Sequence, residues 1–93
     1  MNREELVVVS ALMHQIAKII GVGAEAKIEP GYNISIQFDD EDKIIDAAKE
    51  FGEPIICIER NINLYRYRWS FTYNGVEFYC ISEKEYKDAE ISE

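Results

Sequence analysis

Side chains suited to catalysis are scarce in this 93-residue sequence. His14 is the one histidine, and Ser10 precedes it by four residues, a spacing that lets two side chains meet on a helix. A nucleophilic serine needs a base that a third group orients, and no acid is placed to hold the imidazole of His14. Gly21 and Gly23 lack the third glycine and the Lys-Ser/Thr pair of a phosphate-binding loop. We therefore expect no catalytic residues and a protein that is not an enzyme.

Metal-binding side chains are equally sparse. Cys57 and Cys80 lie inside apolar, strand-like runs without CxxC spacing, so we expect reduced, buried thiols rather than a zinc site or a disulfide. The acidic run at 39–42 lacks the alternating ligands, central glycine and terminal glutamate of a calcium-binding loop. Capping and the helix dipole explain adjacent acids at the start of a helix. The sequence thus predicts no metal and no cofactor.

An acidic helix is the first candidate for a functional surface. At 100° per residue, five carboxylates fall within an arc of roughly 80° if the helix runs from 39 to 53. These residues are Asp39, Asp42, Asp46, Glu50 and Glu53. Such a row could dock on the basic cleft of a nucleic-acid-handling protein and compete with its substrate. The alternative is an ordinary solvated helix face that keeps the protein soluble.

The negative charge is concentrated in two segments. Ten Lys and Arg stand against 18 Asp and Glu, which gives a net charge of -8. Residues 39–53 hold seven acids and two lysines, a net charge of -5, and residues 83–93 contribute -3. A chain with this charge is not expected to bind nucleic acid or a membrane directly, so the expected partner is a protein with a basic surface.

Two arginines and a tyrosine form a second candidate surface. Arg66 and Arg68 lie two residues apart in an expected strand, so their side chains point to one face, which Tyr79 of the next strand shares. The guanidinium groups could hold phosphates while the tyrosine stacks on a base. The alternative function is therefore a nucleotide- or small-ligand-binding domain. The simpler interpretation pairs the arginines with Glu77 across the hairpin.

The elements that position these residues begin with a helix over 3–20. Its apolar residues fall within one half of the helical wheel, Asn2 suits the N-cap, and Gly21 can end it. We expect the main core helix here, with an apolar face wide enough to touch a second helix or a second subunit as well. Acids before its apolar stretch and polar residues within it exclude a signal peptide or a membrane span, so we expect a soluble, cytoplasmic protein.

A first hairpin follows around Pro30-Gly31, with strands at 24–29 and 32–38. A three-residue loop at 30–32 keeps apolar residues on one face. It opposes Ile28 with Ile34, Ala26 with Ile36, and Ala24 with Phe38. A second helix then begins at Asp39 or Asp40 and ends at Phe51, where Gly52 and Pro54 stop it.

The unbroken apolar run at 55–58 is typical of a strand covered on both faces, so we expect it to be the central strand. Asn74-Gly75 then predicts a hairpin with a type I′ turn between 65–73 and 76–81. This turn opposes Tyr73 with Val76, Phe71 with Phe78, and Trp69 with Cys80. Ser82 and Glu85 form a capping-box pattern, which predicts a short C-terminal helix.

Together these elements predict a single α+β domain over 1–93, in the order α-β-β-α-β-β-β, with an antiparallel sheet of about five strands and two helices on one face. Uncovered apolar residues on the open sheet face make homodimerisation through that face a further hypothesis. Small size, acidity and the lack of catalytic groups form a profile that resembles inhibitors encoded by phages and mobile elements, including some anti-CRISPR and DNA-mimic proteins. The predicted function is an acidic, non-enzymatic, protein-binding inhibitor that acts through residues 39–53.

Overall fold

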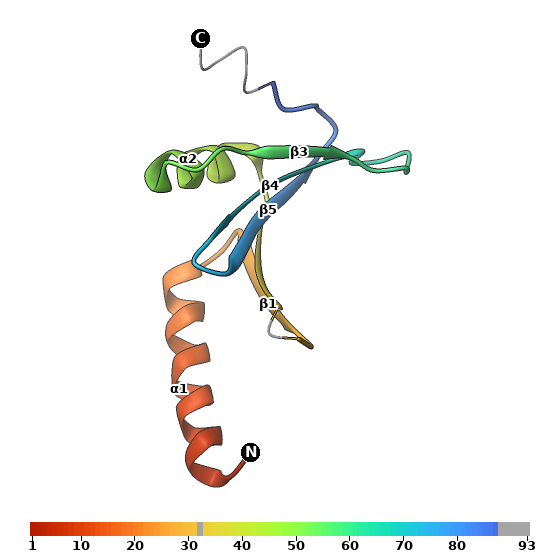
Figure 1. Cartoon of the computed structure of the whole chain (residues 1–93). Coiled ribbons are helices and arrows are strands. Elements are labelled where there is room, and N and C mark those ends of the chain that lie inside the picture. Colours follow the sequence, from red (N-terminus) through yellow and green to blue (C-terminus); the bar gives the residue numbers. More distant parts are fainter. Residues whose placement is uncertain (32, 88–93) are drawn as a thin grey trace.

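The computed structural model describes residues 1–31 and 33–87 (Figure 1). It shows an α+β protein with a five-stranded mixed sheet and two helices. The elements are α1 (Arg3–Ile20), β1 (Ala24–Glu29), β2 (Asn33–Phe38), α2 (Glu41–Phe51), β3 (Ile56–Glu59), β4 (Tyr67–Tyr73) and β5 (Val76–Ser82). In Figure 1, α2 lies along the sheet, whereas α1 projects away from it next to β1. The predicted order from the first helix to the last strand is confirmed.

Both hairpins have the registers that their turn residues predict. The β1–β2 hairpin opposes Ile28 with Ile34. The β4–β5 hairpin opposes Trp69 with Cys80, and the two residues of its Asn-Gly turn have φ values of 54° and 80°. Positive φ at both positions is what a type I′ turn requires. Local turn chemistry therefore determines the pairing within each hairpin.

The expectation of a purely antiparallel sheet is wrong. The strand order is β1-β2-β5-β4-β3, and β2 runs parallel to β5. After β2, the chain crosses through α2 to the far edge of the sheet and returns through β4, which places β5 beside β2. The parallel pairs join residues 34–37 to 76–79, two segments far apart in sequence. No turn signals such a pairing, because a parallel pair is formed by a crossover rather than by a hairpin.

β3 is an edge strand, not the central strand that its apolar run predicts. Ile56 is 58% exposed and Ile58 is 52% exposed, on the face opposite α2. Cys57 lies between them on the other face and packs against the core. An unbroken apolar run indicates two covered faces. Within the described residues, only the face that carries Cys57 is covered.

α2 supplies the helical half of the core. Asp40 is its N-cap, and Gly52 ends it in the left-handed conformation with φ of 67°, as predicted. Two residues of this helix, Ile44 and Ala48, are buried on the side that faces the sheet. They belong to a cluster with Ile55, Trp69, Phe71 and Cys80. The core is therefore one helix packed on the middle strands of the sheet.

α1 adds nothing to this core, so the predictions of a main core helix and of two helices on one sheet face are wrong. None of its residues is buried, although Asn2 caps it as predicted, in a capping box with Glu5. Leu6, Leu12 and Ile19 are 49%, 56% and 83% exposed. An amphipathic pattern indicates that a helix face needs covering but not what covers it. In this fold, α2 occupies the helical side of the sheet.

The segment after β5 also differs from its prediction. Residues 83–87 form no helix, and the rest of the predicted C-terminal helix lies outside the described residues. Trp69 Nε1 donates a hydrogen bond to Lys84 O at 2.9 Å, and Tyr86 N donates to Cys57 Sγ at 3.3 Å. The rings of Tyr86 and Trp69 lie 5.0 Å apart. The segment thus packs on the α2 side and extends the core there.

Candidate functional site

The solvent side of α2 carries three exposed carboxylates, Asp42, Asp46 and Glu50, which we term the acidic face. Because they are spaced by four residues, each step rises about 6 Å along the helix axis. Ile44 and Ala48 fix the opposite side of the helix in the core. Within the described residues, no salt bridge involves a member of the acidic face. The helix therefore presents a fixed row of three carboxylates, with Lys49 at its edge.

The other two predicted carboxylates lie outside α2. Asp39 precedes the N-cap, and its Oδ1 is 2.7 Å from Lys43 Nζ. This hydrogen bond is the main cause that raises the pKa of Lys43. Glu53 follows the C-cap Gly52 and is partly buried. The predicted row of five carboxylates assumed a helix from 39 to 53, but α2 covers only Glu41–Phe51. The structure therefore brings three of the predicted residues together and separates the other two from them.

Gly23 lies in the loop between α1 and β1 and contacts the residues at the start of α2. Its carbonyl accepts a hydrogen bond from Asp39 N at 2.9 Å. A Cβ at Gly23 would collide with Lys43 Nζ and lie 2.9 Å from Asp39 Oδ2. The absence of a side chain therefore lets the Asp39–Lys43 ion pair lie directly against this loop.

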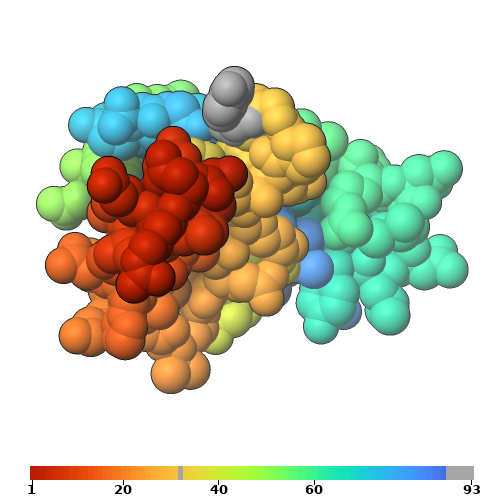
Figure 2. Space-filling model, turned by 90° about the horizontal axis from the view of Figure 1, so that it is seen from below, coloured from red at the N-terminus to blue at the C-terminus, as the bar shows by residue number. Residues whose placement is uncertain are grey.

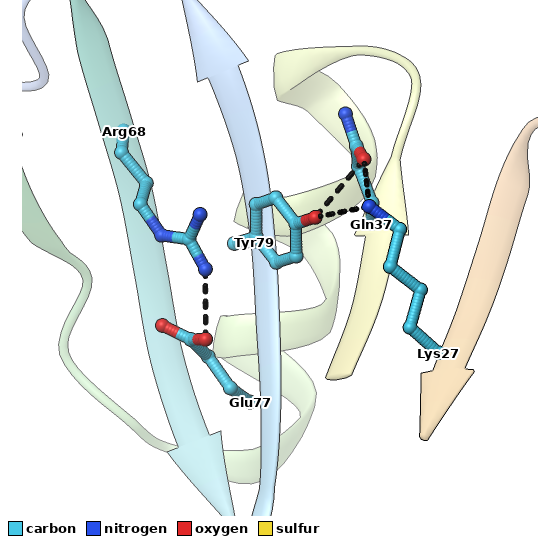
Figure 3. A network of polar contacts seen from close by, with 5 residues as sticks. All are labelled: Lys27, Gln37, Arg68, Glu77 and Tyr79. Carbon is cyan, nitrogen blue, oxygen red and sulfur yellow. Dashed lines mark hydrogen bonds and ion pairs between the residues drawn. The ribbon is translucent and has the colours of Figure 1, made fainter. Parts of the chain in front are cut away.

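A row of polar side chains crosses the open face of the sheet, the face opposite α2 (Figure 3). Arg68 Nη2 donates to Glu77 Oε1 at 2.8 Å, and the guanidinium carbon of Arg68 lies 3.7 Å from the ring centroid of Tyr79. Tyr79 OH donates to Gln37 Oε1 at 3.0 Å. Lys27 Nζ donates to Tyr79 OH at 3.1 Å and to Gln37 Oε1 at 3.3 Å. The row joins β4, β5, β2 and β1.

This polar row covers the open face over β1, β2, β5 and β4, where no helix of the described chain packs, and leaves β3 exposed at the edge. Tyr79 is 6% exposed and Ser70, its neighbour on β4, is 7% exposed. The hydrogen bond to Tyr79 raises the pKa of Lys27, and the nearby carboxylate of Glu25 raises it further. The cations of the row are therefore held by groups of the protein itself. Homodimerisation through this face stays a prediction.

Arg66 is separated from this row. It lies before β4, in the loop between β3 and β4, which Figure 2 shows on the opposite side of the molecule from α1. It helps to line an open hollow of about 450 Å³ to which neither Arg68 nor Tyr79 contributes. The structure thus brings together two of the three residues of the alternative ligand site, and the simpler pairing of Arg68 with Glu77 is observed.

The sequence gives no signal for two members of the row, Lys27 and Gln37. Strand alternation places both on the polar side of the first hairpin, but they reach Tyr79 only because β2 pairs with β5. No turn residue in the chain indicates that β5 is the neighbour of β2. The Arg68–Glu77 pair is different, because both residues belong to one hairpin whose register the Asn-Gly turn determines.

Within residues 1–31 and 33–87, the remaining reactive side chains form no cluster. Ser10 and His14 are both exposed on α1, and no hydrogen bond joins them in the described residues. Cys57 and Cys80 are free thiols. Burial raises the pKa of Cys80 to about 12, with added contributions from the carboxylates of Glu41 and Asp40. In the described part of the chain, no three His, Cys, Asp or Glu side chains gather as metal ligands.

Comparison with known proteins gives no relative. No family model, curated protein or solved structure matches the chain. Over residues 1–31 and 33–87, neither helix combines the length and the hydropathy needed to cross a bilayer.

Proposed function

We propose that this chain is a non-enzymatic protein-binding module, an acidic inhibitor that occupies the basic surface of a nucleic-acid-handling protein. The observation that supports this proposal is the acidic face of α2. Its three carboxylates are exposed, lack salt bridges within the described chain, and stand on a helix anchored by Ile44 and Ala48. A fixed row of negative charge competes with nucleic-acid phosphates for the same basic groups. This is the mode of action expected of a DNA-mimic or anti-CRISPR inhibitor.

The charge distribution supports such a partner. Residues 39–53 carry a net charge of -5 out of -8 for the whole chain. Concentrated charge steers a basic partner toward one side of the molecule and accelerates association. Because a Debye length is about 8 Å at physiological ionic strength, binding should weaken steeply when salt is added.

Charge reversal on the acidic face tests the proposal. Asp46→Lys with Glu50→Lys changes two exposed residues without altering the first turn of α2, where acids also stabilise the helix. The wild-type chain should capture a nucleic-acid-binding protein from its host and block that protein's DNA or RNA binding. The double variant should lose both effects while its circular dichroism spectrum is unchanged.

Glu83→Lys with Glu85→Lys is the matched control, because it makes the same change in net charge at two exposed positions outside α2. This control should capture and inhibit as the wild type does. Equal inhibition by the Asp46/Glu50 variant would overturn the proposal. So would a captured partner whose nucleic-acid binding the wild-type chain leaves intact.

A further inference from the structure

α1 carries an apolar seam with the spacing of a helix-pairing surface. Five apolar residues follow one another at intervals of three, four, three and four positions, which is heptad spacing. We term these residues the α1 seam: Leu6, Val9, Met13, Ile16 and Ile20. Val9 and Met13, near its middle, are 41% and 40% exposed. A seam of this kind normally receives the side chains of a facing helix.

The apolar surface extends beyond the seam. Val8, Leu12 and Ile19 widen it on one flank and are 55%, 56% and 83% exposed. With the exposed parts of Leu6, Val9 and Met13, these side chains amount to roughly 500 Å² of apolar surface, the size of the largest patch on a typical monomer. A continuous patch of this size along one helix marks an interaction surface rather than scattered exposed residues.

Neither face of the sheet covers α1. α2 packs on the helical side of the sheet, and the polar row from Arg68 to Lys27 crosses the open face. No residue of α1 is buried by the described chain. We infer that the α1 seam pairs with the same seam of a second copy, which makes the protein an antiparallel homodimer through α1.

A second copy fits the seam because an isologous interface must be complementary to itself. An apolar stripe satisfies that condition, since the two stripes are identical and no like charges face each other at its centre. Two copies together would bury on the order of 1,000 Å², which meets the minimum area expected of a specific interface.

The ends of α1 favour the antiparallel arrangement. The first turn holds Glu4 and Glu5, and the last turn holds Lys18. Lys18 and Glu4 lie on the side of α1 away from the seam, so these charges do not meet across the pair, but antiparallel packing sets the two helix dipoles in opposite directions. It also places the two sheets at opposite ends of the helix pair, because each sheet follows the C-terminal end of its own α1 (Figure 1).

A membrane surface fits the α1 seam less well than a second copy of the chain does. Helices that lie on membranes carry Lys and Arg on the polar face, which anionic lipids attract. α1 holds Arg3 and Lys18 against Glu4 and Glu5, and the whole chain has a net charge of -8. Anionic lipid would therefore repel this protein.

Sedimentation equilibrium of the full chain tests the dimer. The wild type should have about twice the 10.8 kDa mass of one chain at concentrations near 100 µM. Val9→Glu puts a charge in the middle of the seam and should raise the dimer dissociation constant about a hundredfold or more. Val7→Glu makes the same substitution on the outer side of the same helix, where Val7 is 57% exposed, and should leave the dimer intact.

Three outcomes would overturn the inference. One is a wild type that stays monomeric. This outcome includes a monomer that binds vesicles containing phosphatidylserine in a flotation assay. Another is equal weakening by Val9→Glu and Val7→Glu. The third is a dimer that survives Val9→Glu but dissociates with Ile58→Glu, because Ile58 is exposed on the open sheet face, far from the seam.

Cross-linking tests the pairing independently of any charged variant. In the antiparallel register, Leu6 of one copy lies beside Ile16 of the other. In a Cys57→Ser background, a mixture of Leu6→Cys and Ile16→Cys chains should form an interchain disulfide on oxidation, whereas Leu6→Cys alone should not. A cross-link with Leu6→Cys alone would show parallel helices and contradict the arrangement.

The Asp46/Glu50 double variant should remain dimeric, so failure of the proposed function leaves this test unaffected.

Discussion

The guanidinium group of Arg68 lies over the ring of Tyr79, with its central carbon 3.7 Å from the ring centroid. The same guanidinium forms an ion pair with Glu77 at 2.8 Å. Stacking and ion pairing together hold a long side chain across the middle strands of the sheet, where Tyr79 is 6% exposed. An arginine used in this way is already neutralised and partly desolvated. A phosphate would have to displace the Glu77 carboxylate to bind it.

The alternative function, a nucleotide-binding domain that uses Arg66, Arg68 and Tyr79, can be tested by thermal shift. Because Arg68 is paired with Glu77 and Arg66 lies apart from both partners, we expect no rise in Tm with millimolar ATP, GTP or AMP. A rise in the wild type that disappears in the Arg66→Ala/Arg68→Ala variant would contradict this expectation and establish the alternative.

Arg68 should also contribute to stability. Arg68→Ala removes the ring contact and leaves Glu77 without its partner, and we expect a loss of about 1 kcal/mol in the free energy of unfolding. Arg66→Ala removes an exposed arginine from the neighbouring loop and should change stability by less than about 0.5 kcal/mol. Urea unfolding of both variants measures the difference, and equal losses would show that the stacked pair contributes nothing specific.

Gly23 and Gly21 form a matched pair for a test of close packing. Both have positive φ, 98° and 66°, but a Cβ at Gly21 meets nothing within 4 Å. Gly21→Ala should therefore cost only backbone strain, about 1–3 kcal/mol, because φ of 66° with ψ of -138° is a conformation that glycine alone adopts readily. Gly23→Ala should cost more and lower Tm further, because the new methyl group displaces Lys43 and disturbs the Asp39–Lys43 ion pair. A Gly23→Ala variant as stable as Gly21→Ala would contradict this account.

Tyr86 should stabilise the environment of Trp69, the one tryptophan of the chain. Tyr86→Ala removes a ring 5.0 Å from the indole and opens one side of it to water. We expect a red shift of the fluorescence emission and a loss of about 1–2 kcal/mol in stability. Tyr86→Phe keeps the ring and serves as the control. Unchanged emission in Tyr86→Ala would mean that residues 83–87 do not pack on the core in solution.

Cys80 should make stability fall in alkaline solution. Burial is the main cause that raises the pKa of its thiol to about 12 from an ordinary value of 9.0. Between these values the unfolded chain loses the proton while the folded chain keeps it, so stability is complete below pH 9 and is lost as pH rises toward 12. The slope is about 1.4 kcal/mol per pH unit.

The Cys80→Ala variant isolates this effect from other alkaline titrations. It should be less stable than the wild type at pH 7, because it leaves a cavity in the core. The difference between the two free energies of unfolding should shrink as pH rises above 9. A difference that stays constant up to pH 11 would show that the Cys80 thiol ionises as readily in the folded state as in the unfolded state.

The features that could be predicted from the sequence are local ones. Turn and cap residues determine their structures within a few positions, which is why both hairpin registers and the N-caps Asn2 and Asp40 agree with the structure. The β2–β5 pairing depends on where a crossover ends, and no short pattern encodes it. For the same reason, the apolar run around Ile56 did not show that β3 would lie at an edge.

The candidate surfaces show the same difference between local features, which the sequence predicts, and contacts between distant segments, which it does not. Helical spacing predicted the row of Asp42, Asp46 and Glu50, and the caps of α2 explain why Asp39 and Glu53 lie outside it. Contact between Arg68 and Glu77 is a property of one hairpin. Contact of Lys27 with Tyr79 needs two separate hairpins to meet, so it became visible only in the three-dimensional structure.

The position of β5 bears on how the chain reaches its folded state. β5 is the last strand in chain order, yet it holds the β1–β2 hairpin to the other strands. The first hairpin can form early, but during synthesis its inner edge stays unpaired until the rest of the sheet has left the ribosome. Closing that long loop is slow compared with hairpin formation. Nascent chains of this protein therefore expose a sheet edge and the apolar α1 together, and this interval is when they are most prone to aggregate.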